Sequence, residues 1–90
     1  MSLTDLIRER LANFMPLELH IVDDSHLHAG HAGNDGGGHI TVTIVSSHFS
    51  GKSRIMRHQS IYQALQDLIP SRIHALSIKA MTPDENPTRS

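Results

Sequence analysis

The repeat distance between apolar residues most constrains the fold of this chain, because it changes from helical to strand spacing and back. Apolar side chains recur every three or four residues over 3–14, which predicts a first helix. The same spacing returns at residues 61–69 and predicts a second, long helix closed by Pro70. Ile55 and Met56 indicate an additional short helical turn before it.

Three other segments alternate between apolar and polar side chains, which is typical of strands with one buried face. They span residues 17–23, 39–46 and 73–81. In the third segment, His74, Leu76 and Ile78 are expected on one face. A helical crossover favours parallel pairing of the second and third strands, and the first two are expected to pair antiparallel. The sequence therefore predicts a small α+β domain, α-β-β-α-(α)-β, whose three-stranded mixed sheet is covered on one face by helices.

A length of 90 residues fits one domain and is too short for two. We expect the domain to occupy residues 1–83 and residues 84–90 to form a disordered tail. The first residues show neither a signal peptide nor a spanning helix, so we expect a cytoplasmic protein without membrane contact. The formal net charge is −1, so binding to nucleic acid would require a local basic patch.

Cysteine is absent from the sequence, whereas histidine is unusually frequent. The absence of thiols excludes disulfides, cysteine nucleophiles and an iron–sulfur cluster held by this chain's own thiolates. Four histidines lie close together in the sequence: His26, His28, His31 and His39. Residues 24–38 contain almost no apolar side chains, which predicts a surface loop. The histidine group suggests metal or proton binding, but a solvated polar loop explains it without any metal.

A basic stretch surrounds the start of the second helix and is a candidate for phosphate contacts. Its members are Lys52, Arg54, Arg57 and His58. The alternative is a solvated helix end, with His58 hydrogen-bonded within the fold. The turn 50–53 contains one glycine and lacks the Gly-x-x-Gly loop with which KH domains hold single strands.

Enzymatic interpretations find little support in this sequence. The run from His26 to His31 is similar to the zinc-binding run of metallo-hydrolases, but 90 residues cannot supply the rest of such a fold. Asp24, Ser25 and His26 are adjacent in sequence, which seldom gives the geometry of a catalytic triad. We therefore expect a protein that is not an enzyme.

Five short segments together resemble the BolA family, and they span nearly the whole chain in the family's order. They are 24–31 (Asp-Ser-His-Leu-His-Ala-Gly-His), Ser46-x-x-Phe49-x-Gly51-Lys52, Arg57-His58-x-x-Ile61-Tyr62, 73–76 (Ile-His-Ala-Leu) and Thr82-Pro83-x-Glu85. The combination is far more specific than any one of these segments.

The resemblance implies a fold like the class II KH domain and a partner, a monothiol glutaredoxin with a Cys-Gly-Phe-Ser site. Such pairs share a two-iron, two-sulfur cluster, which the BolA chain does not bind alone. The family's histidine ligand maps onto His74, and the second ligand comes from the loop between the first two strands. His28 is the first candidate and His31 the next, with His26 and His39 ranked lower. Imidazole replaces thiolate on one iron in Rieske centres, which agrees with this implied ligand set.

The resemblance also implies an alternative function, since some BolA proteins are described as transcriptional regulators. In that case Lys52, Arg54 and Arg57 would contact DNA. Alone, the protein is expected to be a monomer or a weak homodimer. The favoured expectation remains an adaptor in iron–sulfur cluster maturation or regulation.

Overall fold

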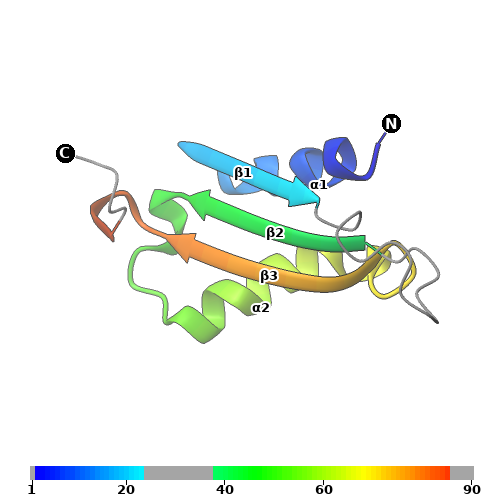
Figure 1. Ribbon diagram of the computed structural model, residues 1–90. Helices are drawn as coiled ribbons and strands as arrows, with labels where there is room; N and C mark the ends of the chain where they lie inside the picture. The colour runs from blue at the N-terminus through cyan, green and yellow to red at the C-terminus, as the bar shows by residue number, and fades with distance from the viewer. Residues whose placement is uncertain (1, 24–37, 86–90) are drawn as a thin grey trace.

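The computed structural model describes residues 2–23 and 38–85 (Figure 1). Its elements follow the order α1 (Leu3–Leu11), η1 (Ala12–Phe14), β1 (Glu18–Asp23), β2 (Gly38–Val45), η3 (Ser47–Phe49), α2 (Arg54–Leu65), η4 (Gln66–Leu68), β3 (Ile73–Met81) and η5 (Pro83–Glu85), where η denotes a one-turn 3₁₀ helix. No helix among these residues is long and apolar enough to cross a membrane.

The three strands form one sheet in the order β1-β2-β3. β1 pairs antiparallel with β2, and β2 pairs parallel with β3. Both helices lie on the same side of this sheet, and its other face is open (Figure 1). The α+β class, the mixed sheet and its one-sided helical cover are therefore confirmed.

The core lies between the central strand and the two helices. β2 contributes Ile40, Val42 and Ile44, which are fully or almost fully buried, as their alternation predicts. Buried side chains of the helices pack against them: Ile7, Leu11, Ile61 and Leu65. Burying each such aliphatic side chain contributes about 1.5–3 kcal/mol, so this cluster is the main source of stability.

The helix α2 begins at Arg54, earlier than the apolar spacing indicates. The Ser53 hydroxyl caps its first turn by accepting a hydrogen bond from the Met56 N–H at 3.1 Å. Ile55 and Met56 belong to this first turn and form no separate helix, and they are 71% and 51% exposed. Apolar periodicity missed the start of α2 because its first turn faces solvent.

A β-bulge at the start of β3 changes the predicted face of His74. Gly38 pairs with Ile73 and His39 with Ala75, so His74 is the extra residue on β3. Ile73 and Leu76 therefore both contribute to the core on the helical side, while His74 is exposed. The prediction that His74 shares a face with Leu76 is wrong, because strict alternation ignores the bulge.

Two segment ends also differ from expectation. Leu17 precedes β1 and is 65% exposed, although its N–H still donates to the Val45 carbonyl at 2.8 Å. At the other end of the chain, residues 83–85 form η5, so ordered structure continues two residues past the expected boundary at 83. Glu85 fixes this turn through contacts described below, and residues 86–90 lie outside the described residues.

Candidate functional site

The histidine predicted as a metal ligand lies exposed at one end of the sheet. The bulge places His74 beside His39, and their ring centroids are 5.9 Å apart with a tilt of 38°. His39 is half-buried and alternates with the buried Ile40, so its ring lies on the open face of the sheet. The structure thus brings His74, the ligand that the resemblance implies, close to His39, a lower-ranked candidate for the second ligand.

The loop that carries the other candidates is anchored at this same end. Asp23 ends β1 and Gly38 begins β2, and Gly38 pairs with Ile73, the residue before His74. His26, His28 and His31 lie outside the described residues. Asp23 and Gly38, the described residues on either side of residues 24–37, therefore lie at the same end of the sheet as the histidine pair.

The donor chemistry of this end fits half of a metal site. The described residues contain no group of three or more His, Cys, Asp or Glu side chains that could hold a metal ion. His39 and His74 can supply imidazole nitrogen, and the sequence has no cysteine to supply sulfur. These residues therefore fit an iron–sulfur cluster only if the sulfur ligands come from another molecule.

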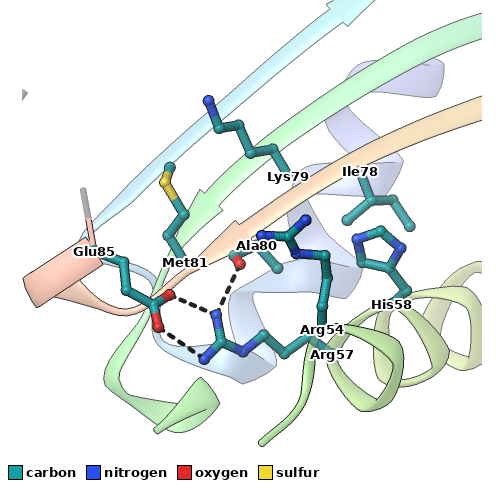
Figure 2. Close-up of a pocket in the computed structure, with 8 residues that line it drawn as sticks. All are labelled: Arg54, Arg57, His58, Ile78, Lys79, Ala80, Met81 and Glu85. Carbon is teal, nitrogen blue, oxygen red and sulfur yellow. Dashed lines mark hydrogen bonds and ion pairs between the residues drawn. The ribbon is translucent and has the colours of Figure 1, made fainter. Parts of the chain in front are cut away.

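The basic stretch lies elsewhere, at the end of β3 that is distant from His74. Arg57 is the most enclosed of its members, with 11% of its side chain exposed. Its guanidinium donates to the backbone carbonyls of Lys52 at 2.9 Å and Ala80 at 3.1 Å. It also forms a two-pronged ion pair with Glu85 at 2.6 and 3.1 Å (Figure 2). We call this set of contacts the Arg57 clasp.

The Arg57 clasp shifts the titration of both charged groups. The guanidinium of Arg57, together with the N–H of Thr82, lowers the pKa of Glu85 from its usual 4.5 to about 2. The hydrogen bonds that Arg57 donates to Glu85 in turn raise the pKa of Arg57. Arg57 lies on α2 and donates to Ala80 on β3 and to Glu85 on η5, so it holds these three elements together. Its guanidinium is therefore hydrogen-bonded without any external phosphate.

A groove with a volume of about 710 Å³ lies between α2 and β3, and two of the remaining basic residues, Arg54 and His58, line it. Arg54, Arg57 and His58 line it from α2, and residues 78–81 line it from β3. Figure 2 shows Arg54 rising from α2 toward β3, whereas the Lys79 side chain extends away from α2. Lys52 does not line the groove, and its described role is to offer its carbonyl to Arg57.

Two residues of this region, Lys79 and Glu85, were missed as site residues by sequence reasoning. Glu85 belongs to one of the segments that carry the family resemblance, as does Arg57, and this was the signal available in the sequence. Lys79 is one of the polar residues in an alternating strand, and nothing in the sequence distinguishes it from solvated lysines. Lys79 and Arg54 line the same groove only because α2 packs beside β3.

Together, the fold and these sites define a small α+β domain with exposed histidines at one end of a mixed sheet and a basic groove at the other. The family model described as BolA-like protein matches residues 11–85, and the chain belongs to this family.

Relatives and solved structures agree with this assignment. The chain is 49% identical over 86 residues to SufE-like protein 1, chloroplastic/mitochondrial, of Arabidopsis thaliana, covering 88% of this chain and 23% of that protein. It is 36% identical over 86 residues to the DNA-binding transcriptional regulator BolA of Haemophilus influenzae, covering 94% of this chain and 82% of the relative. The structure of the BolA domain of SufE1 from Arabidopsis thaliana matches with a TM-score of 0.82 at 45% identity, covering 96% of this chain and 99% of that chain.

Proposed function

We propose that this protein is a non-catalytic adaptor in iron–sulfur cluster maturation or regulation. It binds a monothiol glutaredoxin with a Cys-Gly-Phe-Ser site and contributes His74 and a second histidine to a two-iron, two-sulfur cluster that the pair shares. The observation that carries this proposal is the exposed His74 beside His39, at the sheet end where the histidine-rich loop is anchored. The cluster is not bound by this chain alone.

Two further facts support the proposal. The chain has no cysteine, so it can complete a cluster only by imidazole or oxygen ligation. One relative is named SufE-like protein 1, and the solved BolA domain of SufE1 shares this fold. The bulge gives His74 a fixed origin on a paired strand, which suits a ligand that must meet a partner's surface in one orientation.

The second histidine ligand is the finer part of the proposal. His28 and His31 keep their ranking from the sequence, with His26 below them. His39 gains support because its ring already lies beside His74.

A titration of cluster-loaded monothiol glutaredoxin with this protein, recorded by visible circular dichroism, tests the proposal. We expect the spectrum to change to that of a new species and to reach a plateau at one chain per glutaredoxin. Alanine variants of His28, His31 and His39 then identify the second ligand, because only its loss should reduce the change. A spectrum that stays that of the glutaredoxin alone would refute the proposal.

A DNA-binding regulator is the second candidate, because relatives at 34–36% identity carry that name. Arg54 and Lys52 are exposed and suit phosphate contacts, whereas Arg57 is occupied by its clasp. We expect salt-dependent binding to duplex DNA, and we expect this binding to be weaker in the double variant Lys52→Ala/Arg54→Ala. Absence of binding at low salt would exclude this candidate.

A further inference from the structure

The groove between α2 and β3 has no role in the proposed cluster site. Arg54, Arg57 and His58 form one wall, because positions separated by three and four residues share a helix face. Ile78 and Ala80 contribute apolar surface from β3. Five of the eight lining residues have ionisable side chains, so charge would decide much of what the groove can bind.

The backbone of β3 is partly covered along this groove. β3 is an edge strand, so its outer backbone groups have no strand partner. The Tyr62 hydroxyl donates to the Leu76 carbonyl at 3.3 Å, and Arg57 donates to the Ala80 carbonyl at 3.1 Å. Ile78 lies midway between them, so its N–H and C=O point to the same outer side.

The two covered carbonyls leave a short accessible length of strand edge. In the described part of the chain, no side chain bonds to the backbone of Ile78. An extended segment could therefore form hydrogen bonds only across this short stretch, because Tyr62 and Arg57 block the edge on either side. The arrangement suits a short peptide better than a full additional strand.

The charges beside this edge select for an acidic occupant. Neither Arg54 nor Lys79 has an acidic partner among the residues that the structure describes. Glu85 is the acidic residue lining the groove, and it is already paired with Arg57. Ile78 lies on the helical side with Arg54, whereas the Lys79 side chain points to the other face of the strand. In an extended occupant, a carboxylate at Arg54 and an apolar side chain at Ile78 would belong to alternate residues, and the residue between them would place a second carboxylate at Lys79.

Nucleic acid fits the groove less well than a peptide does. The cationic face of α2 is turned toward β3, so it is not presented as a helix that enters a DNA groove. Among the groove residues, His58 has the only ring on which a base could stack. Both features favour a protein segment over DNA.

We propose that this groove binds a short, extended, acidic segment of a protein partner, with carboxylates at Arg54 and Lys79 and backbone hydrogen bonds at Ile78. Ala80 follows His74 by six positions along β3, which corresponds to roughly 20 Å of strand. The groove is therefore distinct from the histidine end. A glutaredoxin at one end and a second protein at the other could be held at the same time.

A fluorescein-labelled peptide with the sequence Glu-Glu-Val-Glu-Glu is a suitable probe, because it offers carboxylates on both faces and an apolar side chain on the Ile78 face. The Gln-Gln-Val-Gln-Gln peptide is its neutral control. We expect saturable fluorescence polarisation for the acidic peptide only. Amide shifts in a ¹⁵N-labelled sample should concentrate on residues 54–58 and 78–81. Lack of saturable binding, or shifts confined to other regions, would overturn the proposal.

Charge-reversal variants locate the contact. Arg54→Glu should weaken binding by about tenfold, whereas Arg8→Glu, an equal charge change on the exposed side of α1, should leave it within about twofold. His74→Ala should bind the peptide like the original protein, which separates this proposal from the cluster adaptor. Equal losses in the Arg54 and Arg8 variants would contradict it.

Two competing occupants are tested with the same protein. A duplex DNA that displaces the peptide and shifts the same amides at lower concentration would overturn the proposal in favour of nucleic acid. Sedimentation that shows dimers, abolished by Arg54→Glu, would overturn it in favour of a second copy. The proposal is supported if the protein is a monomer and DNA does not displace the peptide.

Discussion

Replacing Arg57 with Met tests whether the Arg57 clasp is structural. The Arg57 side chain is 11% exposed. The substitution keeps most of its aliphatic stem and removes the guanidinium, which donates to two backbone carbonyls at 2.9 and 3.1 Å. Bonds of this kind contribute about 1–1.5 kcal/mol each, so we expect a loss of about 2–3 kcal/mol. For a domain of this size, each kcal/mol lowers Tm by about 4–8 °C, which gives a decrease of about 8–24 °C.

Thermal unfolding followed by far-UV circular dichroism measures this change, and Arg54→Met provides the matched control. Arg54 lies one turn earlier on α2, is exposed and has no described partner, so its variant should unfold within about 2 °C of the original protein. Equal Tm values for the two variants would refute the structural role of Arg57. They would also restore Arg57 as a residue available for phosphate contacts.

Two more predictions concern the clasp and the core. Glu85 has a pKa lowered from 4.5 to about 2, so its stabilising contribution is complete above pH 4.5 and is lost as the pH falls toward 2. Urea unfolding of the original protein and Glu85→Gln should therefore differ at neutral pH and converge only as the pH approaches 2, and a pH-independent gap would contradict this. Phe49 is fully buried with its ring centroid 5.5 Å from that of Phe14, so Phe49→Ala should cost about 3–5 kcal/mol in the same assay. A cost below 1 kcal/mol would show that the site repacks freely.

The order and pairing of the strands could be predicted because the central strand has a regular pattern. Ile40, Val42 and Ile44 alternate without interruption and face both helices. The position of His74 could not be predicted in the same way, because a bulge adds one residue and no side-chain pattern signals it. Tertiary pairing with β2 decides this position, and alternation along one strand contains no information about it.

The basic residues show a second limit of sequence reasoning. Lys52, Arg54 and Arg57 look alike as a cluster of charges, yet only the structure shows that Arg57 is bonded within the fold. One of the segments that resemble the BolA family likewise contains a residue whose contacts lie within the fold. Ser46 is fully buried, donates to the Phe14 carbonyl at 2.5 Å and accepts from the His48 N–H, so this segment stabilises the fold.

The most direct test of the adaptor function is pulsed electron paramagnetic resonance of the reduced complex with monothiol glutaredoxin. The account predicts strong nitrogen hyperfine couplings that change when this chain carries ¹⁵N-histidine. The coupling of one histidine should be lost in His74→Ala, whereas the full coupling should be retained in His48→Ala, which removes an exposed histidine from η3. Unchanged nitrogen couplings in the His74 variant, or none in the original complex, would contradict the account.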